Sequence, residues 1–396
     1  MEIKGKTAIA EIFTDNIEES ALNWLRDLCD HPAMESAHIV QMPDVHAGNS
    51  CNIGTAYRIG AYVNPDHVGA DIGCTVSMHR LSAKVLPDDF ALLDHRIRET
   101  IPTGNDICEK NSLNEKELFR FLNSRYQRAR SSAPDLIDEA PRIDAAFISV
   151  FCRRTKLQEG IFYKSIGTLG GGNHFIEYGE SDSGWLTIHC GSRNLGVKVA
   201  NHWRSIAQNP RRAQYMGYLW GEQLRTYISD MVIAQAYALY NHCIIRDRVF
   251  AVLRKLCKAK CEESIFTTHN YIDVADETPM LRKGAIDAGA GRKVAIPFNM
   301  LDGIAIGTGK GNERWLNTAP HGAGRLMSRA QARKEITLAE FEDTMAGIFS
   351  SSICRGTIDE SPMAYKPTEE ILRLIEPTID IIEIVRPKLN IKDKGE

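Results

Sequence analysis

Hydrophobic positions along the chain predict alternating amphipathic helices and short buried strands. Apolar residues recur at helical spacing between Asn16 and Asp30, and Pro32 beyond them favours a helix end. From Val40 to Arg80 the pattern changes to short β-prone runs such as "TVSMHRL", which are separated by Gly, Pro, Asn and Asp. This region therefore predicts strands that are joined by tight turns.

The rest of the chain continues this alternation with longer helical stretches. Residues 113–142 are charged and largely helical in pattern, and residues 222–259 contain neither Gly nor Pro, which predicts one or two long helices. Strands are predicted at "GWLTIHC", before a glycine loop "GSRNLG", and at "ESIFTTHNY" and "RKVAIPF". The C-terminal part predicts a helix and then a strand. Because no Pro- or Ser-rich linker interrupts the chain, we expect one mixed α/β domain over residues 1–396, with 113–142 and 222–259 as candidate helical insertions.

The composition is that of a soluble globular protein, with 43% hydrophobic and 25% charged residues and a net charge of −3. No apolar run approaches the ~20 residues that span a bilayer, and "MEIKGKTAIAEIF" lacks the pattern of a signal peptide, so we expect a cytoplasmic protein without a membrane segment. The ten scattered cysteines form no dense disulfide framework and suit a reducing compartment. The near-neutral charge argues against binding of nucleic acid through bulk electrostatics, although it is compatible with a local basic groove.

Candidate chemistry is concentrated in glycine-rich patches at the ends of apolar strands. Glycine lets a backbone approach a ligand closely or adopt a positive φ, and loops at strand ends are where α/β proteins place their functional groups. The patches are "MPDVHAGNSCNIG", "VGADIGC", "LGGGNHFIE", "TIHCGSRNLG", "TTHNY" and "PHGAGR".

Side chains from these patches have the chemistry of metal ligands. Asp71 and Cys74 lie three residues apart, so that one turn can direct both at a single ion. Three histidines at strand or loop boundaries complete the set, namely His174, His189 and His269. A lone His or Cys is more often packed or hydrogen-bonded than bound to a metal, but the recurrence of these residues beside loops favours one or two divalent ions. Cys and His suit Zn²⁺ and the carboxylate admits Mn²⁺, so the residue types leave the metal open.

Two of the loops can also bind phosphate. "LGGGNH" and "HGAGR" offer consecutive backbone N–H groups that form an anion-binding concavity, although neither is a Walker loop. The sequence after Gly324 predicts a helix whose N-terminus would favour a phosphate, and Arg325 adds a fork of donors. His321 in this loop is then a candidate nucleophile. A glycine-rich turn that opens an ordinary helix explains the same residues.

Weaker candidates lie beside these patches. Cys190 follows His189 and suggests a thiol nucleophile, but neighbours on a strand point to opposite faces. Asp44 and His46 are two residues apart and can share a face. These two residues would support the site, as a base or as hydrogen-bond partners of the ligands. Alternatively, they would only stabilise a turn.

The patches occur in an order that is typical of one family. "MPDVHAG", "VGADIGC", "GTLGGGNHFIE", "HCGSRNLG", "RKGA", "APHGAGRLMSR" and "DESPMAYK" follow one another from about Met42 onwards, and "GGGNHF" together with "HGAGR" is highly specific. On these motifs the chain resembles the RtcB family of RNA ligases. The resemblance implies an α+β fold with a central metal-lined cleft, and a GTP- and Mn²⁺-dependent ligase that joins an RNA 3′-phosphate or 2′,3′-cyclic phosphate to a 5′-hydroxyl. It implies no membrane partner, and a monomer is the simplest expectation.

The same resemblance assigns roles to residues of this chain. His321 matches the histidine that becomes guanylylated, and Arg193 matches a contact with RNA phosphate. The residues that match ligands of two Mn²⁺ ions are Asp71, Cys74, His174, His189 and His269. Contacts with the guanine nucleotide are implied for Asn173, Glu177, Asn270, Pro297, Gly324, Tyr365 and Lys392. The choice of lysine stays open, because the family usually ends in Lys-Gly and Lys394 is the lysine that precedes glycine here.

Three departures from the family pattern indicate a divergent paralogue. Thr75 replaces a glycine after "DIGC", and Asn194 in "GSRNLG" replaces a glycine where we expect a positive φ, which Asn tolerates better than most residues. Residues 297–303, "PFNMLDG", replace a nucleotide loop that is usually P-G-S-M-G. We therefore expect a role in RNA repair rather than tRNA splicing. Two other functions stay open, namely a metal-dependent RNA phosphoesterase or cyclic phosphodiesterase that does not ligate, and a non-catalytic RNA-binding paralogue.

Overall fold

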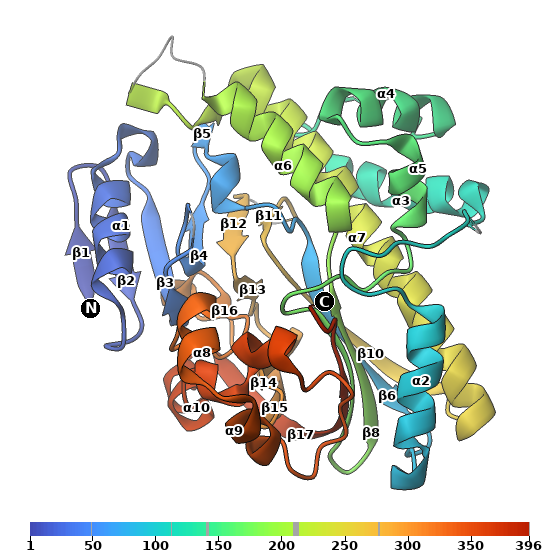
Figure 1. Ribbon diagram of the computed structural model, residues 1–396. Coiled ribbons are helices and arrows are strands. Elements are labelled where there is room, and N and C mark those ends of the chain that lie inside the picture. The colour runs from blue at the N-terminus through green and yellow to red at the C-terminus, as the bar shows by residue number, and fades with distance from the viewer. Residues whose placement is uncertain (49, 112, 140–141, 209–213, 276–277, 396) are drawn as a thin grey trace.

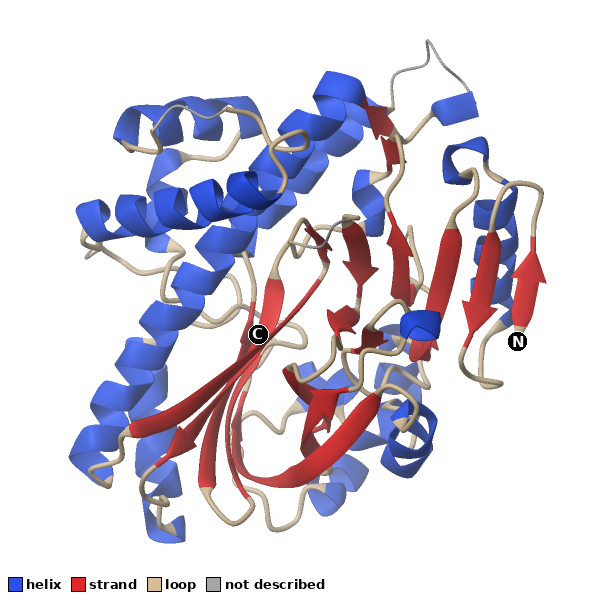
Figure 2. Ribbon diagram, turned by 180° about the vertical axis from the view of Figure 1, so that it is seen from behind, coloured by secondary structure: helices blue, strands red, loops and turns tan. Residues whose placement is uncertain are grey.

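The computed structural model describes residues 1–48, 50–111, 113–139, 142–208, 214–275 and 278–395 (Figure 1). Two β-sheets lie at its centre and helices surround them (Figure 2). This mixture of helices and largely antiparallel strands confirms the expected α+β class. None of the helices in the described ranges combines the length and the apolar composition that crossing a membrane requires.

The first sheet has the strand order β1-β2-β3-β4-β12-β11. Its strands are β1 (Glu2–Lys4), β2 (Ile9–Ile12), β3 (His38–His46), β4 (Ile53–Arg58), β12 (Met280–Lys283) and β11 (Tyr271–Asp273). β2 and β3 are parallel, and helix α1 (Glu19–Asp30) makes the crossover between them, with Leu25 and Leu28 buried. Because β11 and β12 come from the second half of the chain, both halves contribute to one sheet.

The second sheet is antiparallel and has the order β10-β6-β8-β7-β17-β15-β14. Its strands are β10 (Cys261–His269), β6 (Cys74–Leu81), β8 (Gly184–Cys190), β7 (Phe175–Glu180), β17 (Ile379–Ile391), β15 (Gly303–Gly309) and β14 (Lys293–Asn299). Its two outermost strands also contact each other, and the N–H of Ala295 on β14 donates to Thr267 Oγ1 on β10 at 2.9 Å. The sheet therefore curves back on itself into an almost closed barrel (Figure 2).

Short strands and helices complete the fold. Two further strand pairs are β13 (Ala285–Asp287) with β16 (Thr318–Pro320) and β5 (Tyr62–Val63) with β9 (Leu219–Trp220). Among the described residues, the other α-helices apart from α7 are α2 (Phe90–Thr100), α3 (Glu115–Ser132), α4 (Ala145–Thr155), α5 (Glu159–Lys164), α6 (Arg193–Ala207), α8 (Arg329–Glu335), α9 (Leu338–Thr344) and α10 (Thr368–Ile375). Figure 1 shows α8, α9 and α10 grouped beside β14 and β15, away from α3 to α6.

The sequence pattern from residue 222 onwards forms one long helix, α7 (Gly221–Leu256), of 36 residues. It contacts α2, α3 and α6 and the backs of β6 and β8 (Figure 1). Its first half, with Tyr227, packs in the same hydrophobic cluster as α3 and α6, whereas its second half, with Ile245 and Val249, packs in the cluster behind the second sheet. The helix therefore supplies core to both parts of the molecule.

One loop prediction was wrong because apolar periodicity extends further than the glycines suggest, and one predicted helical segment is helical over only part of its length. The segment "GSRNLG" is the beginning of α6, since Leu195, Val199 and Trp203 form a buried helical face. In residues 113–142, helix α3 ends at Ser132, and positions 140–141 of this predicted segment lie outside the described residues.

The helix expected directly after Gly324 begins later. Helix α8 starts at Arg329, where the hydroxyl of Ser328 accepts a hydrogen bond from the N–H of Gln331 at 3.2 Å. An N-cap of this kind fixes the helix start, so Gly324 lies in an extended turn rather than at a helix N-terminus. The phosphate-binding argument based on a helix dipole at Gly324 therefore does not hold.

Candidate active site

The candidate ligands lie along one edge of the second sheet. Because neighbouring strands there are antiparallel, the last residues of one strand lie beside the first residues of the next. Cys74 begins β6 and lies opposite His269, the last residue of β10. His189, near the end of β8, lies opposite Phe175, which begins β7 and follows His174. Strand pairing thereby gathers residues that are far apart in the sequence.

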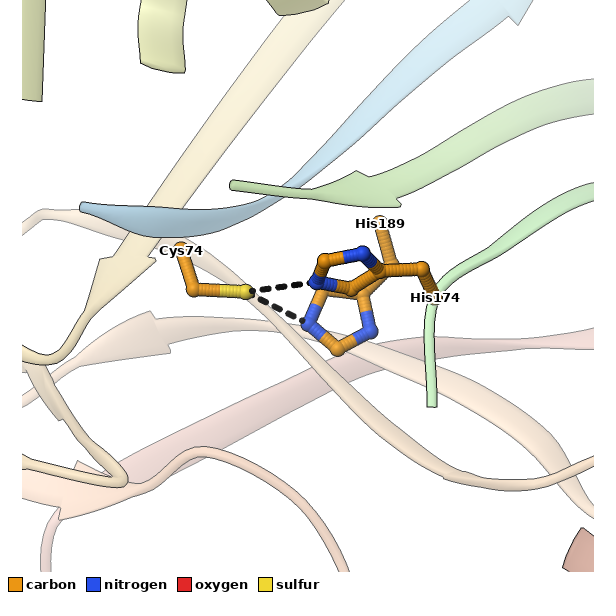
Figure 3. Close-up of side chains that lie close together, drawn as sticks. All are labelled: Cys74, His174 and His189. Atoms are coloured by element: carbon orange, nitrogen blue, oxygen red, sulfur yellow. Dashed lines mark hydrogen bonds between the residues drawn. The ribbon is translucent and has the colours of Figure 1, made fainter. Parts of the chain in front are cut away.

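The side chains with ligand chemistry contact one another at this edge of the sheet. Cys74 Sγ is 3.5 Å from His174 Nε2 and 3.2 Å from His189 Nε2 (Figure 3). His174 Nε2 is also 2.9 Å from Asp71 Oδ2, and His189 Nε2 is 3.3 Å from His269 Nε2. The structure thus brings together every residue that the sequence proposed as a metal ligand.

Backbone carbonyls fix the orientation of two imidazoles in this cluster. His174 Nδ1 donates to the carbonyl of Leu169 at 3.0 Å. His189 Nδ1 donates to the carbonyl of Asn173 at 3.1 Å. Because a carbonyl only accepts, Nδ1 carries a proton in both rings, so Nε2 is the atom that each ring directs toward Cys74 and can offer to a metal ion. Converging nitrogen lone pairs, a sulfur and a carboxylate oxygen are stabilised by a cation, so the donor set fits a divalent metal ion such as Zn²⁺ or Mn²⁺.

Burial and neighbouring charges shift the pKa values of these groups. Burial alone would raise the pKa of Asp71, but His174 outweighs it and holds that pKa well below its usual range. Burial and adjacent imidazoles hold the pKa values of His189 and His269 well below the ordinary value, so both rings are neutral and can act as ligands. Burial and the nearby Asp71 raise the pKa of the Cys74 thiol, so a metal ion that binds the thiolate must displace a proton.

His321 lies beside this cluster, directly after β16, with its ring centroid 4.7 Å from that of His269. Its Nδ1 is 2.7 Å from Oδ2 of Asp44, and its backbone N–H donates to the same oxygen at 3.2 Å. Asp44 is fully buried on β3. The carboxylate therefore holds the proton of Nδ1, which leaves the lone pair on Nε2. Of the alternatives for Asp44, the structure favours a supporting role in the site.

A cavity of about 300 Å³ is lined by His321 together with most of the ligand cluster. Its wall also contains every residue that was predicted to contact the nucleotide, namely Asn173, Glu177, Asn270, Pro297, Gly324, Tyr365 and Lys392. Gly324 has a φ of 73°, and a Cβ there would lie 2.2 Å from the carbonyl oxygen of Asp44. The turn beside His321 therefore requires glycine.

Buried acceptors face this cavity from β7 and β17. Asn390 lies opposite Glu177 in the sheet, and its Nδ2 donates to Glu177 Oε2 at 2.8 Å. The other oxygens, Glu177 Oε1 and Asn390 Oδ1, are buried without a hydrogen-bond partner. Burial raises the pKa of Glu177 to about 8, and N–H donors of a bound ligand would favour its ionised form, in which both oxygens accept. Unsatisfied buried acceptors in a cavity wall indicate a ligand with N–H donors.

Glu360, to which the sequence gave no role, is the centre of a buried charge network. Its carboxylate is 3.0 Å from Lys392 Nζ and 2.5 Å from Arg329 Nη1. It is also 3.6 Å from Arg325 Nη1 and accepts a hydrogen bond from the Tyr365 hydroxyl at 2.9 Å. Burial alone would raise the pKa of Glu360, but these cations lower it to about 2. The charged carboxylate fixes Lys392 and Tyr365 in the cavity wall, and its only signal in the sequence was the motif "DESPMAYK".

Arginines that were expected to contact phosphate are anchored within the protein. Arg325 lines the cavity but donates to the carbonyl of Asp359 at 2.5 Å. Arg193 donates to Thr168 Oγ1 at 3.0 Å and to the carbonyl of Gly104 at 2.7 Å. It does not line the cavity, but it packs beside His174, because a Cβ on Gly170 would lie 2.1 Å from Arg193 Nη1 and 2.7 Å from His174 Nδ1. A contact between Arg193 and RNA stays a prediction.

The departures from the family pattern have different consequences. Thr75 pairs with Thr268 at 2.9 Å on the face of β6 opposite to Cys74, so it does not change the ligand cluster. The positive φ expected at Asn194 was wrong, because Arg193 has the φ of 55° and Asn194 lies within helix α6. Residues 297–300 line the cavity, so this departure does alter its wall.

Comparisons with known proteins agree with this arrangement. A family model described as "tRNA-splicing ligase RtcB" matches residues 25–393. The RNA-splicing ligase RtcB of Escherichia coli (strain K12) is 30% identical over 364 residues, which cover 85% of each chain. The tRNA-splicing ligase RtcB of Nanoarchaeum equitans is 27% identical over 85% of this chain and 84% of its own length. That of Methanococcus maripaludis is 25% identical over 94% of this chain and 90% of its own length.

Proposed function

The chain belongs to the RtcB family of RNA ligases, and on this premise we propose that it joins an RNA 3′-phosphate or 2′,3′-cyclic phosphate end to a 5′-hydroxyl end with GTP and Mn²⁺. The observation that carries the proposal is the geometry of His321. Its Nδ1 is held by the buried Asp44, and its ring lines a cavity that it shares with the ligand cluster. A histidine held in this way is suited to attack a phosphate through Nε2.

The proposed reaction has three displacements at phosphorus. The lone pair of His321 Nε2 forms a bond to the α-phosphorus of GTP while the bond to pyrophosphate breaks, and Asp44 stabilises the ring as it becomes positively charged. An oxygen of the RNA 3′-phosphate then displaces His321 from GMP. The 5′-hydroxyl finally displaces GMP from the activated RNA end. A cyclic phosphate must first be opened by water.

The ligand cluster is the proposed metal-binding site of this reaction. The residues that would hold Mn²⁺ are Asp71, Cys74, His174, His189 and His269. A bound divalent cation neutralises phosphate charge and stabilises the leaving pyrophosphate. Because the same donors also suit Zn²⁺, a test of the reaction must compare several divalent ions.

The buried acceptors in the cavity support GTP over ATP. Guanine carries N–H donors at N1 and N2, whereas N1 of adenine is an acceptor. The unpartnered Glu177 Oε1 and Asn390 Oδ1 can accept from guanine, and Lys392 can donate to its O6. Adenine would leave these buried acceptors unsatisfied, which disfavours its binding.

GTP labelled at the α-phosphate tests the proposal. The protein is incubated with this GTP and Mn²⁺, Zn²⁺ or Mg²⁺ in parallel, and the label is followed on denaturing gels and mapped by mass spectrometry. RNA with 3′-phosphate and 5′-hydroxyl ends is then added. We expect an acid-labile GMP adduct on His321 and joined RNA. Opening of cyclic phosphates without GTP, without adduct and without joining would instead identify a phosphoesterase.

The role in RNA repair is tested by the choice of substrate. It rests on the altered cavity wall at residues 297–300. We expect broken RNAs of unrelated sequence to be joined faster than cleaved tRNA halves at equal concentrations. Equal or faster joining of tRNA halves would exclude this specialisation.

The two C-terminal lysines are predicted to differ in their effect on GTP. Lys392 lines the cavity, whereas Lys394 lies outside its lining, and the carbonyl of Lys394 accepts from Cys354 Sγ. We expect Lys392→Met to raise the KM for GTP in adduct formation by roughly 10- to 100-fold, as the loss of a charged hydrogen bond does. Lys394→Met is the matched control and should leave this KM unchanged. Initial rates of adduct formation over a series of GTP concentrations give the KM of each variant. A larger increase of KM in Lys394→Met would assign the guanine contact to Lys394 instead.

A further inference from the structure

Lys392 lies directly after the strand pairing that orders the rest of β17. The register between β17 and β7 ends with Ile391 opposite Ile176. The side chain of Lys392 lines the nucleotide cavity, and its Nζ is 3.0 Å from the carboxylate of Glu360. A backbone beyond the end of a strand ladder needs other hydrogen-bond partners to keep one position. The position of the Lys392 backbone therefore depends on groups outside the sheet.

Ser352 binds both polar groups of the Lys392 backbone through its hydroxyl. The N–H of Lys392 donates to Ser352 Oγ at 2.9 Å, and this hydroxyl donates to the carbonyl of Lys392 at 3.0 Å. Ser352 is fully buried. A hydroxyl has one proton to donate and two lone pairs to accept with, so Oγ can accept from one further donor.

Arg98, in the last turn of α2, is this further donor. Its Nη2 donates to Ser352 Oγ at 2.6 Å, and its Nη1 donates to the carbonyl of Lys392 at 3.1 Å. Its Nε lies 3.2 Å from both carboxylate oxygens of Asp94, one turn earlier in the helix. Ser351 Oγ accepts from the same Nε at 3.0 Å and donates to Asp94 at 2.8 Å. The guanidinium is therefore fixed along one edge by Asp94 and Ser351, and it directs the other edge at Ser352 and Lys392.

The ion pair of Arg98 and Asp94 is largely withdrawn from solvent, with side chains that are 21% and 8% exposed. Such a pair contributes little to stability on its own, because desolvation of both charges offsets their attraction. What the pair does supply is direction, since the planar guanidinium holds two donors in a fixed geometry. Both donors point to the residue whose side chain enters the nucleotide cavity, which favours a role in orienting Lys392 over a role in stability alone.

We propose that Arg98 and Ser352 are positioning residues for the guanine nucleotide, because they fix the backbone from which Lys392 reaches guanine. The inference rests on the proposed function, in which Lys392 contacts guanine. A binding group must be held within about 0.5 Å of its productive position, and its supporting partners provide this precision. Arg98 and Ser352 stay outside the lining that His321 shares with the ligand cluster. Their loss should therefore weaken GTP binding and leave the chemical step unchanged.

The KM for GTP and the maximal rate of adduct formation test this inference with the full chain and Mn²⁺. We expect Arg98→Met to raise this KM by roughly 3- to 10-fold, as the loss of a hydrogen bond does, with a maximal rate close to that of the wild type. Ser352→Ala should act in the same direction, and Arg98→Lys should restore part of the affinity. Arg96→Met is the matched control, because Arg96 lies on the same helix, is exposed and pairs with Glu99 at 2.9 Å.

A double-mutant cycle separates positioning from a general loss of structure. If Arg98 acts through Lys392, Arg98→Met raises the KM in the wild type but has no further effect on the raised KM of Lys392→Met. The same factor in both backgrounds overturns the proposal, and so does an unchanged KM in Arg98→Met. A lower maximal rate with an unchanged KM also overturns it. If Arg98→Met unfolds below the assay temperature, Ser352→Ala is taken through the same cycle.

The same assay distinguishes failure of this inference from failure of the proposed function. A wild type that forms no adduct contradicts the proposed function, and this inference with it. A normal KM in Lys392→Met contradicts the guanine contact on which the positioning depends. A raised KM in Lys392→Met together with a normal KM in both Arg98→Met and Ser352→Ala contradicts only the positioning role.

Discussion

His321→Ala is expected to abolish the proposed GMP adduct and, with it, the joining of RNA ends, because the variant lacks the imidazole that we propose to attack GTP. We expect adduct formation to slow by a factor on the order of 10⁴ or more, as when the nucleophile of a covalent mechanism is removed. The fold should persist, since His321 lies in a cavity wall with its side chain 17% exposed. The measurement is transfer of label from GTP to protein, together with thermal unfolding of the variant.

A second substitution at this site separates orientation of the ring from nucleophilicity. In Asp44→Asn the amide can donate to Nδ1 of His321, which moves the ring proton to Nε2 and removes its lone pair. We expect much slower adduct formation with normal GTP binding. His38→Ala is the matched control, because His38 is partly exposed and contacts Glu11 away from the cavity, and it should react at the normal rate. Label that persists in His321→Ala, or that maps to another residue, would exclude His321 as the nucleophile.

Cys74→Ala is the other substitution with a large expected effect. It removes the sulfur that lies between His174 and His189, and so opens the ligand cluster at its centre. We expect metal affinity and ligase activity to fall by more than about 100-fold, since loss of even an outer partner of a metal ligand costs about 10- to 100-fold. Elemental analysis gives the bound metal, and added Mn²⁺ should no longer raise the unfolding temperature of the variant.

Cys190 provides a matched control for this prediction. It follows His189 on β8 and is equally buried, but its sulfur lies on the other face of the sheet, 3.5 Å from Asn241 Nδ2. Cys190→Ala should keep its metal and activity with a small loss of stability. Normal metal content in Cys74→Ala would contradict the metal site, and equal losses in both variants would point to general destabilisation instead.

The residue types of the site could be predicted from the sequence because ligand-type side chains in glycine-rich loops seldom serve core packing. Their assembly could not be predicted in the same way. Cys74 and His189 are 115 residues apart and meet only because β6 pairs with β8, and His269 joins them because β6 also pairs with β10. Which strands pair across such a distance in the chain is decided by long-range packing, and local periodicity does not reveal it. Only the resemblance of the motifs to those of the family indicated that the ligands and His321 lie in one site.

Other parts of the site depended on interactions that motifs do not describe. Glu360 has a role only because Lys392 and two arginines compensate its buried charge. Asn390 contacts Glu177 only through the register of β17 with β7. The loop prediction at "GSRNLG" was wrong for a local reason. Its two glycines favour a loop, whereas Leu195 and the apolar residues that follow it at helical spacing form the buried face of α6.

The strand β17 has a consequence for synthesis of the protein on the ribosome. Residues 379–385 pair with β15 and residues 386–391 pair with β7, so this strand joins the two parts of the curved sheet. It is the last strand in chain order, and a nascent chain that has not reached Ile379 leaves the edges of β7 and β15 unpaired. Such a chain also lacks Asn390 and Lys392. Prematurely terminated products are therefore expected to aggregate and to be degraded, rather than to persist as slow ligases.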